Sequence, residues 1–212
     1  MPRDVKSELT KVDLPPSLRF DFPTAIVVVS CATGRNQRPN LIAVGAISHA
    51  CIDPPMLGIA IGHTRYTYQV IAHSDSFVVN VPSKDQVEIV DYCGSVSGRK
   101  IDKFKACGLT PFASTKISSL GILEFPLNIE CTIRKSVDLG SHSFYFGEIV
   151  AVHCDESILD DKGTIDKEKL EPMCAFLESY WSLREPVLRF GSHRKIRKAK
   201  RSYSKAKLGI TY

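Results

Sequence analysis

Residues 24–31, TAIVVVSC, decide the fold class, because β-branched and apolar residues follow one another there almost without interruption. Such a run favours a buried strand. Its apolar part is far shorter than the roughly 20 residues that a membrane-spanning helix needs. Residues 40–50 and 55–62 have the same character, and the turn-forming residues Asp53-Pro-Pro separate them. The pattern therefore predicts three strands close together in the sequence.

Further strands are expected later in the chain. Residues 77–81, 127–134 and 144–152 alternate or run apolar as strands do, with residues 136–143 as the hairpin loop between the last two. A polar turn is expected at residues 34–39, GRNQRP. That makes about six strands of mainly antiparallel character.

Short helices are expected between these strands. Thr64 can cap one that runs through Ile71, and Ser83-Lys-Asp-Gln86 matches a capping box in front of another. Strands outnumber helices and do not alternate with them as in βαβ units. The predicted fold class is therefore mainly β, a closed or partly closed antiparallel barrel with peripheral helices. A doubly wound nucleotide-binding fold is disfavoured.

The composition is that of an ordinary globular protein, with 212 residues, 43% of them hydrophobic and 24% charged. The net charge of +5 comes from the last 20 residues, which hold eight Lys and Arg and no acid, so residues 1–192 have a net charge of −3. We expect one domain over residues 1–185 and a basic tail over residues 186–212. The tail is either a solvated extension or a contact for nucleic acid, acidic lipid or an acidic partner.

The first residues are charged and show no apolar signal segment, so a cytoplasmic protein is expected. Seven cysteines lie at least 14 positions apart, without a Cys-x-x-Cys pair. We therefore expect reduced cysteines, mostly buried as small apolar residues, and no metal site.

Common catalytic motifs are missing from the sequence. There is no G-x-G-x-x-G, no G-x-S-x-G and no H-E-x-x-H. Residues 94–100, GSVSGRK, differ from a phosphate-binding Walker loop by one missing spacer residue and by Arg in place of Lys. Nucleotide hydrolysis and metalloprotease chemistry are therefore disfavoured, and no side chain stands out as a catalytic acid, base or nucleophile.

Two segments favour an anionic ligand. Residues 63–68, HTRYTY, follow a strand and open a helix, so they place hydroxyl groups and Arg65 near free backbone N–H groups. Residues 97–103, SGRKIDK, add a glycine, a hydroxyl group and three cations. Plain helix capping and a solvated loop explain each segment alone. Together they favour a phosphorylated small ligand.

Several motifs lie in order between about residues 20 and 180. They are Asn40 at the head of an apolar strand, Asp53-Pro-Pro, residues 64–68, residues 77–80 (FVVN), residues 108–111 (GLTP), residues 127–131 (LNIEC), residues 140–142 (GSH) and residues 147–148 (GE). In this order they resemble the flavin reductase-like family. Residues 91–104, DYCGSVSGRKIDKF, resemble its flavoredoxin branch in particular.

The resemblance implies a Greek-key split β-barrel that binds FMN and forms a homodimer, with the flavin near the subunit interface. It places Asn40 against the flavin ring or ribityl chain and His142 near the ring or the polyol chain. It also places one strand segment along the flavin and a group of polar residues around the phosphate. The strand segment consists of Ala46, Ile47 and Ser48. The residues around the phosphate are Arg65, Thr67 and Lys103, together with Thr64, Ser97 and Arg99 from segments 63–68 and 97–103.

Two details qualify this picture. Many members of the family carry Trp at about the place of Ala46, so the ring would be less covered here. The segment near Phe176 also contributes in some relatives. The flavin itself supplies the redox chemistry, and the protein binds and orients it.

Three functions follow as hypotheses. The first is an FMN-dependent reductase that takes hydride from NADH or NADPH and passes electrons to free flavin or a redox partner protein. The second is an FMN electron-transfer protein of flavoredoxin type without a nicotinamide site. The third is a module that binds nucleic acid or an acidic surface through the basic tail. The first is preferred.

Overall fold

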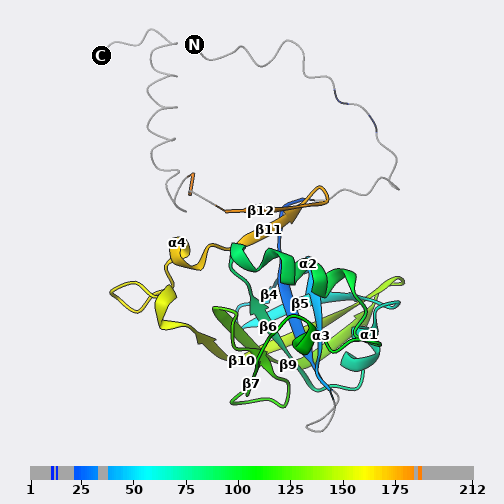
Figure 1. Cartoon of the computed structure of the whole chain (residues 1–212). Helices are drawn as coiled ribbons and strands as arrows, with labels where there is room; N and C mark the ends of the chain where they lie inside the picture. The colour runs from blue at the N-terminus through cyan, green and yellow to red at the C-terminus, as the bar shows by residue number, and fades with distance from the viewer. Residues whose placement is uncertain (1–10, 12, 14–21, 33–37, 184–185, 188–212) are drawn as a thin grey trace. The chain divides into compact units, whose positions relative to one another are not determined.

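Strand β2 lies within a seven-stranded antiparallel sheet whose strands follow the order β3-β2-β6-β9-β10-β5-β4 (Figure 1). The computed structural model describes residues 11, 13, 22–32, 38–183 and 186–187. The sheet consists of β2 (Val27–Cys31), β3 (Asn40–Val44), β4 (Ile47–Cys51), β5 (Met56–Gly62), β6 (Ser76–Val81), β9 (Leu127–Asp138) and β10 (His142–Cys154). The prediction of a mainly antiparallel β fold is confirmed.

Smaller elements surround this sheet. A three-stranded sheet has the order β1-β11-β12, and two short strands pair as β7 and β8. These strands are β1 (Thr24–Ala25), β7 (Pro111–Phe112), β8 (Gly121–Ile122), β11 (Met173–Phe176) and β12 (Ser179–Ser182). The helices are α1 (Tyr66–Ile71), α2 (Val87–Ser95), α3 (Lys103–Ala106) and α4 (Lys167–Leu170), with 3₁₀ turns at Lys84–Gln86 and Glu156–Ile158.

Residues 40–50 form two strands where the sequence predicts one. The chain breaks at Gly45 and Ala46, and β3 and β4 then lie at opposite edges of the seven-stranded sheet. The Ala46 carbonyl oxygen accepts a hydrogen bond from the Ala60 N–H at 2.9 Å, which fixes this corner against β5. The bend therefore brings the two edges of the sheet toward each other and makes it curl.

Strand β2 is buried on both faces, which explains its continuous apolar sequence. Val27 and Val29 belong to one hydrophobic cluster, and Val28 belongs to a second cluster that includes side chains from α2 and α3. Since successive strand residues point to opposite faces, both faces of β2 are covered. Burying each such side chain contributes roughly 1.5–3 kcal/mol.

Other boundaries differ from the predicted ones. Strands β9 and β10 extend into the predicted loop, and Ser143 pairs with Asp138, so only residues 139–141 connect them. Helix α1 begins at Tyr66, because the Arg65 N–H bonds to the Gly62 oxygen in a turn and Arg65 occupies the cap position predicted for Thr64.

Two further expectations concern the rest of the chain. The predicted reciprocal contact at Ser83 is present, with its N–H donating to Gln86 Oε1 at 3.0 Å.

None of the described helices is long and apolar enough to cross a membrane. Residues 33–37 of the predicted turn and residues 188–212 of the predicted tail lie outside the described residues. The domain boundary at residue 185 and the role of the tail therefore stay predictions.

Glu130 on β9 is a fully buried carboxylate with several donors. Its oxygens accept hydrogen bonds from the backbone N–H groups of Thr115 (2.7 Å) and Lys116 (2.8 Å), and His153 Nε2 lies 2.6 Å from Oε1. Burial opposes ionisation, but these donors outweigh it, so the pKa of Glu130 lies below its usual value. The carboxylate therefore fastens the loop before β8 to the sheet.

All seven cysteines are free, and four of them are buried, as the sequence predicts. Burial raises the pKa of the Cys31, Cys93 and Cys131 thiols to about 12. The exposed cysteines are Cys51 and Cys154.

We expect a thiol reagent at pH 8 to label the exposed Cys154 quickly in the native protein. The thiolate is the reacting form, and a pKa of about 12 leaves only roughly one thiol in ten thousand ionised at this pH. Mass spectrometry of labelled peptides measures the order of reaction, and the protein unfolded in guanidinium provides the reference in which all seven react. Rapid labelling of Cys31 in the native protein would contradict its buried placement.

Candidate functional site

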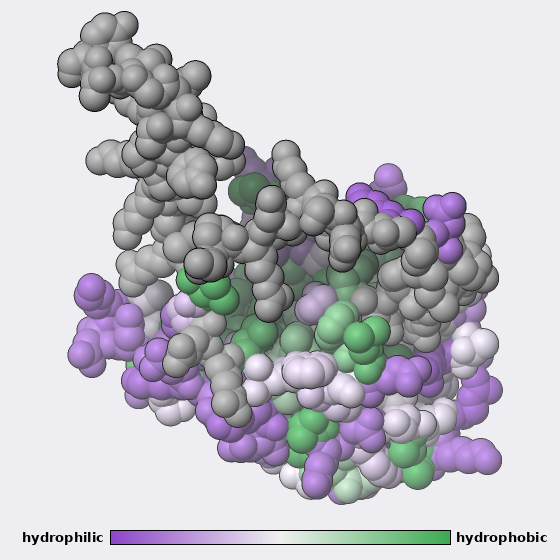
Figure 2. Space-filling view, turned by 90° about the horizontal axis from the view of Figure 1, so that it is seen from above, coloured by the Kyte–Doolittle hydropathy of each residue, from purple (hydrophilic) through white to green (hydrophobic). Residues whose placement is uncertain are grey.

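A cleft of about 780 Å³ opens at the corner where β3 passes into β4. Its walls come from several parts of the chain. One wall is the corner itself, residues 42–48, and a second is the end of β5 (residues 60–62) together with Arg65. The start of β10 contributes His142 and Phe144, and α2 contributes Asp91. The remaining wall comes from residues within 22–26 and from residues 175–180. In Figure 2, where this face is visible, hydrophobic side chains gather in a recess with hydrophilic ones around it.

Five of the residues predicted to bind the cofactor line this cleft. They are Ala46, Ile47, Ser48, Arg65 and His142. The first three come from the corner at which the sheet curls, so the bend that shapes the barrel also places them on the cleft wall. Arg65 precedes α1, and His142 begins β10 beside the end of β5. The structure thus brings together residues almost 100 positions apart in the sequence.

Asn40 and Thr67 lie together but are buried. Asn40 Nδ2 donates a hydrogen bond to Thr67 Oγ1 at 2.6 Å, and the two residues are only 4% and 2% exposed. Gly98 packs directly against this amide, since a Cβ at this position would lie 1.7 Å from Asn40 Oδ1. The two polar side chains therefore satisfy each other, and a glycine is required beside them.

Lys103 and Arg65 both bind the end of helix α2. The buried Lys103 ammonium donates to the carbonyl oxygens of Cys93 (2.6 Å) and Leu41 (2.7 Å), and Arg65 Nη1 lies 3.4 Å from the Gly94 oxygen. The last carbonyl groups of a helix lack partners within the helix, and cations are favourable there. Lys103 therefore stabilises the end of α2. The sequence analysis predicts Lys103 as a phosphate ligand and does not predict this contact with the helix. A Lys ammonium has three donors, so one N–H remains.

The charge around these two cations is not balanced within the described residues. Neither Lys103 nor Arg65 has a carboxylate within ion-pair distance among the residues that the structure describes. Burial lowers the pKa of Lys103, and the nearby Arg65 charge lowers it further. An anion beside Arg65 would weaken this repulsion. Arg65 is therefore the cation on the cleft wall that a negatively charged group could pair with, and Asp91 and Glu178 line the same cleft.

Thr64, Ser97 and Arg99 do not line the cleft. Thr64 is exposed, and Ser97 Oγ accepts only a long hydrogen bond, 3.4 Å, from the Arg99 N–H. The Arg99 guanidinium lies over the Tyr66 ring, 5.7 Å from its centre, and donates to Gln69 Oε1 at 3.2 Å. Arg99 therefore packs against α1, and these three residues are not brought together with the other five.

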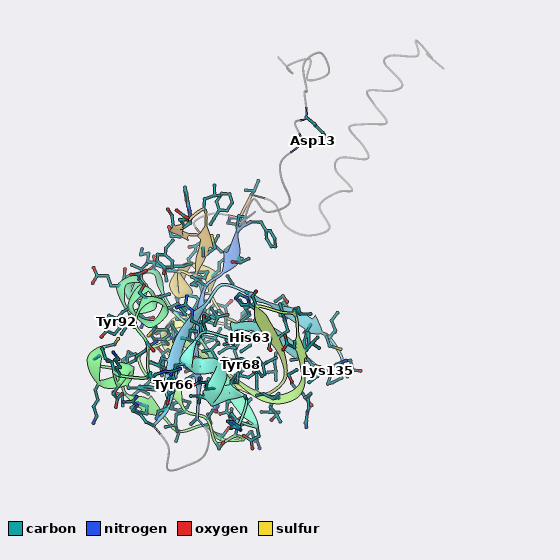
Figure 3. All side chains as sticks on the ribbon, turned by 90° about the vertical axis from the view of Figure 1, so that its right-hand side faces the viewer. Asp13, His63, Tyr66, Tyr68, Tyr92 and Lys135 are labelled. Atoms are coloured by element: carbon teal, nitrogen blue, oxygen red, sulfur yellow. The ribbon has the colours of Figure 1, made fainter. Side chains whose placement is uncertain are left out.

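His142 and its neighbour His63 occupy the end of the β9–β10 hairpin. The exposed His142 ring lies beside Gly62, where a Cβ would come within 3.2 Å of Nε2, and its Nδ1 is 2.8 Å from Ser141 Oγ. The His63 ring lies against the Tyr68 ring, with ring centres 4.6 Å apart and the planes tilted by 40° (Figure 3). Only His142 reaches the cleft.

One wall of the cleft comes from a hairpin that the strand analysis did not predict. Strands β11 and β12 supply residues 175–180, including Phe176 and Tyr180. In the sequence analysis, only the family resemblance connects Phe176 with the site. The aromatic residues Phe176, Tyr180 and Trp181 within residues 173–182 (MCAFLESYWS) are a weak local signal for these strands. Asp91 on α2 was also missed, since one acidic residue in a helix gives no signal.

Comparison with known proteins identifies similar chains. A family model described as the flavin reductase like domain matches residues 18–172. The flavoredoxin of Methanosarcina acetivorans superposes with a TM-score of 0.80 at 28% identity, covering 89% of this chain and all of that one. The flavoredoxin of Desulfovibrio vulgaris (Miyazaki F) gives 0.77 at 29% identity, covering 85% and 98%.

Sequence relatives point the same way. A protein of Archaeoglobus fulgidus is 34% identical over 130 residues, which are 61% of this chain and 73% of the relative. The reductase component of an FADH(2)-dependent resorcinol hydroxylase from Rhizobium sp. is 26% identical over 141 residues, 64% of this chain and 74% of that one. The region that the family model matches contains the β3–β4 corner, Arg65 and His142.

Proposed function

The chain belongs to the flavin reductase-like family, in its flavoredoxin branch with the split β-barrel fold, and on this premise we propose that the cleft binds FMN. We further propose that the protein takes electrons from NADH or NADPH and passes them to an acceptor. The observation that carries the proposal is a cleft with Arg65 on its wall, because this cation has no carboxylate within ion-pair distance among the described residues.

The residues present fit a flavin with a phosphate. Clefts that hold small ligands have volumes of roughly 300–1,000 Å³ and are mostly apolar, with a few polar groups that fix orientation. This cleft has a volume of about 780 Å³, and the charged residues on its wall are Arg65, Asp91 and Glu178. A phosphate dianion beside Arg65 would form charge-assisted hydrogen bonds and balance the charge at the end of α2.

Bound FMN would supply the redox chemistry, and this chain would bind and orient it. Arg65 would neutralise the phosphate, and the exposed backbone at residues 45–48 would lie along the flavin. His142 can donate or accept a hydrogen bond at the ring or polyol chain. Phe144 and Phe176 would exclude water from one side of the cleft. Lys103 would act mainly through α2, and Asn40 and Thr67 through the backbone they hold.

We also propose that the protein is a homodimer in the cytoplasm. Strand β4 is an edge strand whose residues 48–51 are exposed, and Ile52 beyond it is 93% exposed. An unpaired edge with an apolar neighbour favours association with another chain. Light scattering coupled to gel filtration measures the mass directly.

Titration of the flavin-free protein with FMN tests the proposed function. We expect saturable binding with a Kd of about 1 µM or below, seen as quenching of FMN fluorescence. Reduced nicotinamide, added without oxygen, should then bleach the visible absorbance of the bound flavin. A chain that takes up no FMN would refute the binding site.

The same experiment separates reductase from electron-transfer protein. If FMN binds but neither NADH nor NADPH bleaches it, the reductase function is excluded and a flavoredoxin-type electron carrier remains. Bleaching by chemical dithionite is the control, because it shows that the bound flavin can be reduced.

A further inference from the structure

The hairpin of β11 and β12 forms a wall of the cleft without belonging to the seven-stranded sheet. It joins the rest of the domain through β1, where Thr24 pairs with Ala175 and Ala25 with Cys174 (Figure 1). At its base, Met173 is only 5% exposed and packs in the cluster that includes α2. The base of the hairpin is therefore fixed, while its tip extends over the cleft.

The tip has a backbone conformation that its residues do not favour. Leu177 and Glu178 join the two strands with φ of +47° and +58°. Turns with two positive φ angles normally contain Gly, Asn or Asp, because other side chains are crowded in this region. Both residues line the cleft. Such strain persists only where surrounding contacts hold it, and it is found at ligand clamps and switch regions.

A single hydrogen bond between side chains holds the tip against the domain. Tyr180 donates through its hydroxyl group to Asp91 Oδ1 on α2 at 3.0 Å. Within the described residues, no other side-chain hydrogen bond joins residues 173–182 to the rest of the domain. Burial, together with the Asp91 carboxylate, raises the pKa of Tyr180 to about 12, so the phenol stays a donor at neutral pH.

We infer that Tyr180 and Asp91 are a positioning pair that holds the β11–β12 hairpin closed over the cleft as a movable wall. Opening breaks this one side-chain hydrogen bond and leaves the base of the hairpin, with its pairing to β1, in place. With the proposed function as its premise, this pair sets how quickly FMN exchanges with solvent. Slow exchange suits a carrier that keeps its flavin, and fast exchange suits a reductase that releases it.

The hairpin contains its own reporter. Trp181 on β12 is the only tryptophan in the sequence and is 54% exposed. Its Nε1 donates to the Phe176 oxygen across the hairpin at 3.0 Å. In the flavin-free protein, Trp181 fluorescence therefore reports on this segment.

Tyr180→Phe removes only the hydroxyl group, and Tyr92→Phe is the matched control. Tyr92 neighbours Asp91 on α2 and has no side-chain hydrogen bond among those found in the described residues. We expect Tyr180→Phe to release FMN about five to ten times faster than the natural chain and to make Trp181 more accessible to acrylamide. Tyr92→Phe should match the natural chain within a factor of two in both measurements.

A double variant tests whether the two residues act together. Because they share one hydrogen bond, Tyr180→Phe combined with Asp91→Ala should release FMN no faster than Asp91→Ala alone. Additive effects of the two substitutions would show that Tyr180 and Asp91 do not act through one shared hydrogen bond. An unchanged FMN release rate in Tyr180→Phe would show that this bond does not hold the hairpin closed over the cleft. A natural chain that binds no FMN refutes the proposed function instead, and acrylamide quenching of Trp181 then still decides whether Tyr180 holds the hairpin.

Discussion

Replacing Glu130 by Ala is expected to lower the free energy of unfolding by about 3 kcal/mol or more. The backbone N–H groups of Thr115 and Lys116 then remain buried without an acceptor, and each orphaned donor costs about 1–3 kcal/mol. Urea denaturation at pH 7 measures the loss. Glu124→Ala is the matched control, because this carboxylate also accepts a backbone N–H, that of Thr110, but at an exposed site. Its removal should cost less than about 1 kcal/mol.

The effect of Glu130 also has a defined pH dependence. Its folded-state pKa lies below the usual value of 4.5, so its contribution is complete above that value and is lost as the pH falls through the folded-state pKa. The stability difference between the natural chain and Glu130→Gln should therefore be present at pH 5 and shrink as the pH falls below about 4. A difference that keeps growing below pH 4 would contradict the ionised, hydrogen-bonded carboxylate.

Replacing Arg65 by Ala is expected to weaken FMN binding roughly 30-fold and to change riboflavin binding less than twofold. Hydrogen bonds to charged groups contribute about 1.5–3 kcal/mol, and only FMN has the phosphate that Arg65 would contact. Fluorescence titration with both ligands measures the two dissociation constants. Equal losses for FMN and riboflavin would reject Arg65 as a phosphate ligand.

The matched control for Arg65 is Arg99→Ala. Arg99 is also exposed and cationic, but its guanidinium packs on Tyr66 and Gln69 rather than in the cleft. FMN binding should therefore be unchanged. Lys103→Ala and Thr67→Ala are less suitable tests of phosphate binding, because both side chains are buried in contacts that stabilise the fold.

Local sequence patterns predicted most of the central sheet. Residues 24–31 and 55–62 were found because β-branched and apolar runs reflect burial in a strand, and the corresponding strands β2 and β5 are present. The break at Gly45 was missed, since residues on both sides favour strands equally. Strand β11 was missed because it pairs with residues 24–25, about 150 positions earlier, and no local pattern encodes such a partner.

The candidate site was predictable only in part. Arg65 and His142 could be named because the motifs around them occur in the family. The burial of Lys103 depends on how α3 packs against β3 and α2, which its sequence neighbours do not determine. Asn40 and Thr67 were both predicted, but their hydrogen bond to each other requires β3 and α1 to meet. The assignment of all eleven predicted residues to a cofactor stays a prediction.

The corner at Gly45 and Ala46 links ligand affinity to folding. These two residues connect strands at opposite edges of the sheet and also line the cleft. A partly folded chain in which the edges have not yet approached has no cavity to offer. Any ligand that binds this cleft and not the unfolded chain therefore stabilises the native state, by about 2.7 kcal/mol at a free concentration of a hundred times its dissociation constant.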